Sequence, residues 1–305
     1  MAAVLSVRDL HVAYPDGSKA LRGVDLDLAD GECLALVGES GSGKSTLLRA
    51  LLSLLPRGSR VTGSAVVDDG GTPLEAVGAG RTTLRRLRGG LLGYVGQDPH
   101  TAADPLWSVG RHVREAWRAR GTAPPKGAAE KRAEAVGITD AKNRLRQYPH
   151  QWSGGMLQRA HIASAGVHGP LITLADEPTS ALDAGLAATT LAVLRRDARA
   201  LLLVCHDLRH VAAVADRVAV LYAGRVVETG TDVPARPRHP YTRALVAATP
   251  RPGHGLPVEL PGTPPDPRRE VAGCAFAARC PLAVESCRRD DPALTDGVAC
   301  PVVPR

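Results

Sequence analysis

One nine-residue segment, Gly-Glu-Ser-Gly-Ser-Gly-Lys-Ser-Thr at positions 38–46, constrains this chain more than any other. It fits the pattern GxxxxGK(S/T), follows the apolar run 33–37 and precedes a helical pattern at 47–55. A strand that turns through glycines into a helix points several backbone N–H groups into one concavity, where the positive end of the helix adds to the field. The segment is therefore predicted to bind phosphate.

The side chains of this segment have separate expected roles. Lys44 is expected to reach the β- and γ-phosphates of a nucleotide, and the Ser45 hydroxyl to bind Mg²⁺. Gly41 and Gly43 let the backbone approach where a Cβ atom would clash. The alternative is a turn without chemical meaning, which the flanking strand and helix disfavour. The predicted nucleotide-binding residues here are Gly38, Ser40, Gly41, Ser42, Gly43, Lys44, Ser45 and Thr46.

Length and composition limit the classes of protein to consider. The 305 residues suffice for one large α/β domain with an appendage, or for two domains. No run reaches the roughly 18 apolar residues of a membrane span, and residues 1–9 lack a secretory signal pattern. We therefore expect a cytosolic location and a membrane role only through partners. The net charge of +7 would suit nucleic acid or an anionic membrane, but the basic residues are scattered.

The N-terminal part is predicted to form a small antiparallel sheet. Residues 4–14 and 21–28 alternate apolar and polar positions, and Pro15, Asp16 and Gly17 form a turn between them. Tyr14 precedes this turn and could either belong to the core or stack on a nucleotide base. Further strands are expected at 64–68 and 90–95, with a solvated arginine-rich segment between them.

A helical subdomain at about 98–167 is predicted to interrupt the α/β core, with helices at 109–120, 128–136 and 155–167. Continuous apolar runs at 171–175 and 201–205 then alternate with helices at 186–199 and 208–215, which is typical of parallel strands buried on both faces. A hairpin is expected at 218–222 and 225–228. Proline and glycine become dense beyond Thr231, so we expect a domain boundary near Val233 and one short helix at 241–248.

Ionisable residues follow both apolar runs. Because the carboxyl ends of parallel strands line one crevice, Asp176, Glu177 and His206 should converge on Lys44. Asp176 is then placed to hold Mg²⁺, directly or through water, and Glu177 to polarise an attacking water molecule. A surface loop after a buried strand is the alternative for the two acids, and a simple hydrogen-bonding role is the alternative for His206.

The segment Trp-Ser-Gly-Gly-Met-Leu-Gln-Arg at 152–159 resembles the signature of ATP-binding cassette (ABC) ATPases, and this resemblance covers nearly the whole chain. It implies ATP and Mg²⁺ as cofactors, Tyr14 as the adenine-stacking ring and His206 as the switch histidine on the γ-phosphate. It also implies that Gln97 links Mg²⁺ and the lytic water to a transmembrane partner, and that Asp183 couples two sites. The N-terminus of the helix after Ser153, Gly154 and Gly155 should serve the nucleotide of an opposing subunit.

The implied fold is an α/β P-loop (RecA-like) parallel-sheet core with an N-terminal antiparallel β-subdomain, an inserted α-helical subdomain and a small irregular cysteine-rich C-terminal region. The expected division is 1–233 for the ATPase domain and 234–305 for the C-terminal region. Met156 in the signature resembles the ATPases of dipeptide, oligopeptide and nickel importers, which generally pair with a second, different ATPase. The segment 238–245, with His-Pro-Tyr-Thr, and the cysteine-bearing segment 273–300 resemble the C-terminal region of the same group.

Cys274, Cys280, Cys287 and Cys300 lie in a short, irregular stretch that could hardly fold on a core of its own. In a reducing cytosol a metal is a more plausible staple than two disulfides. Four thiolates suit zinc and an iron–sulfur cluster alike, and free thiols are the third alternative. The family resemblance favours a 4Fe-4S cluster over zinc. Two further cysteines, Cys33 and Cys205, lie in apolar runs and should be buried small hydrophobes.

Together these features predict the ATP-hydrolysing subunit of an ABC importer for peptides, nickel or metal chelates, located at the cytoplasmic face of the cell membrane. The expected partners are a second ATPase subunit in a heterodimer, two transmembrane permease subunits and an extracytoplasmic substrate-binding protein.

A non-transport ABC ATPase acting on nucleic acid or the ribosome is the alternative, but it would normally bring a second cassette, a coiled-coil insertion or zinc modules in the core. We therefore expect no nucleic-acid partner. A catalytically silent regulatory cassette is the third interpretation, and the presence of Lys44, Asp176, Glu177 and His206 opposes it.

Overall fold

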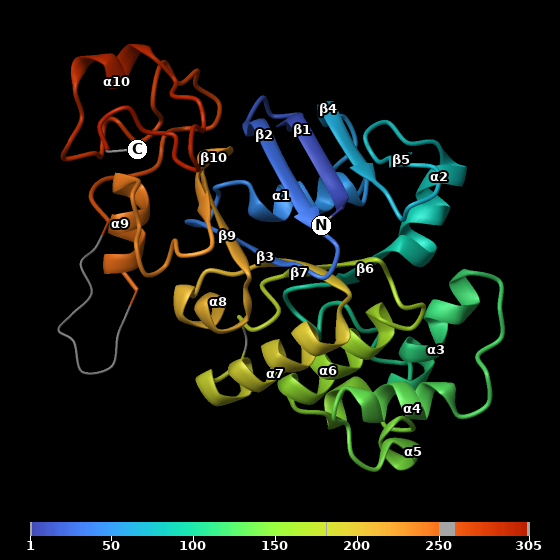
Figure 1. Cartoon of the computed structure of the whole chain (residues 1–305). Helices are drawn as coiled ribbons and strands as arrows, with labels where there is room; N and C mark the ends of the chain where they lie inside the picture. The colour runs from blue at the N-terminus through green and yellow to red at the C-terminus, as the bar shows by residue number, and fades with distance from the viewer. Residues whose placement is uncertain (1, 181, 250–259, 304–305) are drawn as a thin grey trace.

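The computed structural model describes residues 2–180, 182–249 and 260–303, and two β-sheets form its centre (Figure 1). The first sheet is antiparallel with strand order β2-β1-β4-β5. It confirms the strands expected from alternation at 4–14 and 21–28, whereas the short β5 was not predicted. The strands are β1 (Ala3–Ala13), β2 (Lys19–Ala29), β4 (Arg60–Val67) and β5 (Leu74–Glu75).

The second sheet has six strands in the order β10-β9-β3-β8-β7-β6. Its β9, β3, β8, β7 and β6 run parallel, and β10 pairs antiparallel with β9. Every residue of β3, β7 and β8 is buried, which is why these strands read as continuous apolar runs. The strands are β3 (Cys33–Val37), β6 (Leu92–Val95), β7 (Ile172–Asp176), β8 (Ala200–Val204), β9 (Arg217–Tyr222) and β10 (Arg225–Gly230).

Two hydrophobic clusters hold β3, the strand that leads into the phosphate loop. Leu34 and Leu36 belong to the cluster shared with the first sheet, while Ala35 and Val37 belong to the cluster on the opposite face. Cys33 and Cys205 are buried as predicted, and burial raises the pKa of the Cys33 thiol to about 12 and that of Cys205 to about 11. The loop therefore starts from a strand packed on both of its faces.

The predicted helices occur in the predicted order, whereas α2, α5 and α10 were not predicted. Helices α3 to α6 lie between β6 and β7 in the chain and at the lower right of Figure 1, in the range predicted for the helical subdomain. The arginine-rich segment expected to be solvated forms α2 and a π-helical turn at Leu87–Leu91, and no residue of α2 is buried. The helices are α1 (Lys44–Leu51), α2 (Arg81–Arg86), α3 (Val109–Ala119), α4 (Ala128–Ala135), α5 (Ala141–Arg144), α6 (Gly154–Ala165), α7 (Ala184–Asp197), α8 (Leu208–Val214), α9 (Pro240–Ala247) and α10 (Glu285–Arg289), with a short 3-10 turn at Pro149–Gln151.

The C-terminal region packs on the β9–β10 hairpin (upper left of Figure 1). Ala299 donates its backbone N–H to the Val227 carbonyl at 2.8 Å. Tyr241 of α9 and Phe276 lie in the same hydrophobic cluster as Tyr222 of β9. The last part of the chain thus shares a core with the sheet that carries the phosphate loop. Among the described residues, no helix is long and apolar enough to cross a membrane.

Candidate nucleotide-binding site

The structure gathers most of the predicted site residues around one cavity of about 450 Å³. It lies where α1 begins and where β7 and β8 end, so a buried sheet and a helix N-terminus position the side chains around it. Gly38 and Ser42 belong to the same loop without lining the cavity. The lining residues are Tyr14, Ser18, Ala20, Ser40, Gly41, Gly43, Lys44, Ser45, Thr46, Gln97, Glu177, His206 and Pro267.

Lys44 is the first residue of α1, and only 5% of its surface is exposed. Its ammonium group donates to the carbonyl oxygens of Gly38 and Glu39, at 2.8 Å in both cases. Burial lowers the pKa of Lys44 from its usual value, while the nearby Glu177 and Asp176 carboxylates oppose this change. The positive charge is thereby held inside the loop, at the end of α1 that attracts anions.

At two positions of the phosphate loop only glycine fits, because the loop backbone packs closely against neighbouring strands. Gly38 has φ of +153°, and a Cβ atom added there would lie 2.1 Å from the Leu221 carbonyl oxygen. Gly43 has φ of +107°, and its added Cβ would lie 2.5 Å from the Ala20 carbonyl oxygen. The loop is therefore pressed against β9 and β2, so that a side chain at either position would displace it.

Ser45 and Asp176 form an oxygen-rich pair suited to Mg²⁺. The Ser45 hydroxyl donates to Oδ1 of Asp176 at 2.7 Å, and Asp176 is 2% exposed. Hydroxyl and carboxylate oxygens are ligands that Mg²⁺ prefers, together with the phosphate oxygens of a nucleotide. The donor set therefore fits the predicted magnesium site, to which Gln97 is the third predicted contributor.

Glu177 connects the other polar residues of the cavity. Its Oε2 atom lies 3.4 Å from Nε2 of Gln97 and 3.3 Å from Nδ1 of His206. Its backbone has φ of +45°, a left-handed value that is costly for a residue with a side chain, and its N–H donates to the Val204 carbonyl at 3.0 Å. The strained turn directs a carboxylate that is 21% exposed toward the cavity.

Tyr14 lines the cavity and is only half-buried, so its ring is accessible from the nucleotide side. Its hydroxyl lies 2.8 Å from Oγ1 of Thr46, which joins the end of the first sheet to α1. Stacking of this ring on adenine stays a prediction, as do the roles assigned to the other site residues.

The signature residues Ser153, Gly154 and Gly155 and the loop residue Asp183 do not line this cavity. Ser153 caps α6 by accepting the Met156 N–H at 3.4 Å, and Asp183 caps α7 in the same way. Ala181, between the β7 acids and Asp183, lies outside the described residues. The predicted role of the signature toward the nucleotide of an opposing subunit stays a prediction.

Sequence reasoning missed several residues that contact the phosphate loop. The Arg279 guanidinium and the Tyr241 hydroxyl both bind Glu39, and Pro267 lines the nucleotide cavity. Tyr241 lies in the recognised His-Pro-Tyr-Thr segment and Arg279 precedes Cys280, so both were within segments of interest. Their contacts could not be predicted, because some 200 or more residues separate each from Glu39.

The four C-terminal cysteines do not form a metal site in this structure. Cys274 donates its backbone N–H to the Cys287 carbonyl at 2.8 Å, so these parts of the chain are neighbours. All four are free, and in the part of the chain that the structure describes no three His, Cys, Asp or Glu side chains are arranged to hold a metal ion. The predicted 4Fe-4S cluster and its zinc alternative are therefore not supported by the geometry.

Comparison with known proteins identifies the family of this chain. A family model described as ABC transporter matches residues 21–180, which include the phosphate loop, the signature, and Asp176 and Glu177 at the end of β7. The chain belongs to the ABC transporter family. Its activity is therefore ATP hydrolysis. A second model, described as the oligopeptide/dipeptide transporter C-terminal region, matches residues 227–287 of this ABC ATPase.

Individual relatives extend over nearly the whole ABC ATPase. The dipeptide transport ATP-binding protein DppD of Bacillus subtilis is 42% identical over 314 residues, which cover 97% of this chain and 92% of that protein. The peptide ABC transporter ATP-binding protein y4tR of Sinorhizobium fredii is 41% identical over 310 residues, covering 96% and 91%. The ATP-binding cassette MJ0796, solved as a dimer bound to ADP and Pi, has a TM-score of 0.64 and 25% identity and covers 74% of this chain and 98% of its own.

Proposed function

We propose that this chain powers the import of peptides and works from the cytoplasmic face of the membrane. The observation that carries the proposal is the match of residues 227–287 to the oligopeptide/dipeptide transporter C-terminal region. The names of the two relatives described above, which refer to dipeptide and peptide transport, support it. They give no support to nickel as the cargo. The comparisons also do not favour the alternative of an ATPase acting on nucleic acid or the ribosome.

The geometry of the nucleotide cavity supports a separate role for each of its polar residues. Lys44 would bind the β- and γ-phosphates of ATP, and Ser45 and Asp176 would hold a Mg²⁺ ion that neutralises phosphate charge. Glu177 accepts a proton from the attacking water, since its carboxylate faces the cavity between Gln97 and His206. Gln97 and His206 orient that water and the γ-phosphate. Tyr14 receives the adenine ring.

A second ATPase subunit completes the site in this proposal. Ser153, Gly154 and Gly155 lie away from the cavity of their own chain, at the N-terminus of α6, where backbone N–H groups can bind phosphate. Each nucleotide then lies between the phosphate loop of one subunit and the signature of the other. We propose that the partner is a non-identical ATPase, on the resemblance carried by Met156. Two permease subunits and an extracytoplasmic substrate-binding protein complete the importer.

The proposal predicts ATP-driven uptake of short peptides by the assembled transporter. In proteoliposomes containing this chain, the second ATPase and the permeases, a labelled di- or oligopeptide presented with the binding protein should accumulate on the side that holds ATP. The same vesicles with labelled nickel are the control, and they should show no ATP-dependent uptake. Nickel uptake without peptide uptake, or peptide movement in the opposite direction, would contradict the proposal.

The cysteines allow a separate test of the metal hypothesis. We propose that Cys274, Cys280, Cys287 and Cys300 ligate a 4Fe-4S cluster, supported by their residue type and their gathering in one small region rather than by converging side chains. Protein purified anaerobically should be brown and contain iron and acid-labile sulfide, both lost in Cys280→Ser and retained in the control Cys205→Ser. Colourless protein with stoichiometric zinc would assign the other metal. Protein without either metal would leave four free thiols and reject both.

A further inference from the structure

Glu39, the second residue of the phosphate loop, is held by the C-terminal region through two of its three polar groups. Its carboxylate accepts two hydrogen bonds from Arg279, at 2.8 and 3.0 Å, and its backbone N–H donates to the Tyr241 hydroxyl at 2.8 Å. Its carbonyl oxygen, the third group, accepts from Lys44 at 2.8 Å. Glu39 thus connects the C-terminal region directly to the lysine that is proposed to bind phosphate.

The ion pair is built to be rigid. The Arg279 side chain is 4% exposed and that of Glu39 is 22% exposed, so water screens this pair less than a surface pair. Arg279 also donates to the Pro261 carbonyl at 2.6 Å and to the Tyr222 hydroxyl at 3.2 Å. A two-pronged guanidinium–carboxylate contact fixes orientation as well as distance. The Glu39 hydrogen bonds raise the pKa of Arg279, so this residue stays charged at any physiological pH.

Tyr241 is equally well fixed. It is fully buried, and its ring centroid lies 4.4 Å from that of Tyr222 and 5.5 Å from that of Phe276. Tyr222 belongs to β9, the strand beside β3, while Phe276 comes from the C-terminal region. This aromatic cluster anchors the hydroxyl that receives the Glu39 N–H.

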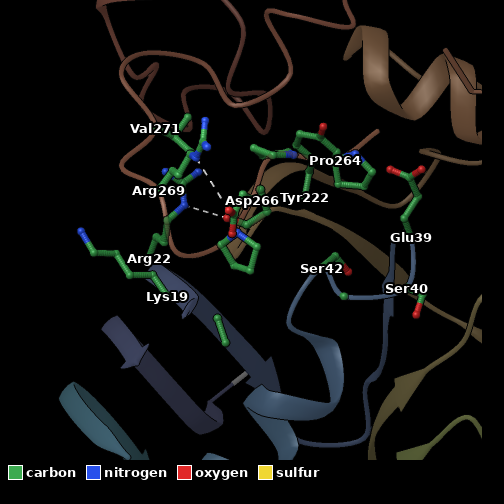
Figure 2. A pocket seen from close by; sticks show the side chains of 15 residues that line it. Lys19, Arg22, Glu39, Ser40, Ser42, Tyr222, Pro264, Asp266, Arg269 and Val271 are labelled. Atoms are coloured by element: carbon green, nitrogen blue, oxygen red, sulfur yellow. Dashed lines mark hydrogen bonds and ion pairs between the residues drawn. The ribbon is translucent and has the colours of Figure 1, made fainter. Parts of the chain in front are cut away.

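Another described part of the C-terminal region, residues 264–267, faces the phosphate loop across a cavity. Figure 2 shows Pro264 above Ser42 and Ser40, with Asp266 and Arg269 further to the left, and all five residues line a cavity of about 280 Å³. A second attachment lies beyond this cavity, where Lys19 donates its backbone N–H to the Pro267 carbonyl at 2.8 Å. Among the described residues, the hydrogen bonds and ion pairs between the C-terminal region and the loop itself are those of Glu39, so we take these contacts as the direct coupling between the two.

We propose that Arg279 and Tyr241 are positioning residues for ATP binding, through which the C-terminal region fixes Glu39 and thereby the binding-competent phosphate loop. If the loop occupies its binding-competent conformation only part of the time, the apparent Kd for the ligand equals the intrinsic Kd divided by the fraction of time spent in that conformation. Changes in the C-terminal region are then transmitted to nucleotide affinity. This inference rests on ATP binding and holds for any cargo, so its failure is distinct from failure of the peptide-import proposal.

The test measures nucleotide affinity of the purified full chain with a fluorescent ATP analogue. Tyr241→Phe removes one hydroxyl from the cluster, and we expect the Kd to rise about 3- to 10-fold. Glu39→Gln and Arg279→Gln should each weaken binding, and the double variant should weaken it no further than the single ones, because both changes break the same contact. Arg289→Gln is the matched control, since the Arg289–Glu285 pair of α10 is exposed.

ATP hydrolysis by the assembled transporter separates positioning from mere destabilisation. Positioning predicts that Tyr241→Phe and the double variant raise the KM for ATP with kcat changed less than about twofold. The variant that carries both Glu39→Gln and Arg279→Gln leaves no unpaired buried charge. It can therefore be measured even if one of the single variants does not fold. Unchanged affinity in both, or a lower kcat at constant KM, would overturn the proposal.

Discussion

Replacing Glu177 with Gln should reduce ATP turnover by the assembled transporter about 10²- to 10⁴-fold, the usual contribution of a general base. The amide has nearly the shape of the carboxylate but cannot accept a proton from water. The Glu177 carboxylate lies 3.4 Å from Gln97 and 3.3 Å from His206, and its left-handed backbone conformation directs the side chain into the cavity. The measurement is phosphate release at saturating ATP.

ATP binding should survive this change, because Lys44, Ser45 and Asp176 are untouched. A fluorescent ATP analogue should therefore bind Glu177→Gln with an affinity within a few-fold of the original chain. Glu285→Gln, at an exposed position of α10, is the control and should behave like the unmodified protein. Unchanged turnover in Glu177→Gln would assign hydrolysis to the site built on the partner's phosphate loop.

Replacing Lys44 with Ala should remove most nucleotide binding by this chain. The variant loses a buried positive charge at the N-terminus of α1 and leaves the Gly38 and Glu39 carbonyls without their ammonium donor. A charge-assisted contact of this kind contributes about 2–3 kcal/mol, which corresponds to roughly a 30- to 150-fold weaker affinity. Titration with a fluorescent ATP analogue measures the loss.

Lys142→Ala is the matched control, because Lys142 is exposed on α5 in the helical subdomain. It removes the same charge without touching the cavity, and its affinity should equal that of the unmodified chain. Equal affinities for Lys44→Ala and Lys142→Ala would contradict the assignment of the nucleotide site.

Much of the fold could be predicted because its elements are local in sequence. The continuous apolar run Cys33–Val37 forms a strand buried on both faces, whereas the alternating pattern of β1 and β2 matches strands with one buried face. The spacing of apolar residues was therefore enough to distinguish the two sheets. Helices α2, α5 and α10 and strand β5 were missed, because six, four, five and two residues are too few to show a period. The metal prediction rested on residue type, and the side-chain geometry does not support it.

The sequence by itself determined the phosphate loop, the order of the elements and the family, because spacing along the chain fixes which groups can share one turn, one strand end or one helix N-terminus. Only the tertiary structure decided how these parts meet. Packing against Leu221 and Ala20 makes Gly38 and Gly43 necessary. The Glu39–Arg279 contact joins residues 240 positions apart, and no local pattern records such a distance, since it depends on how the sheet and the C-terminal region pack together.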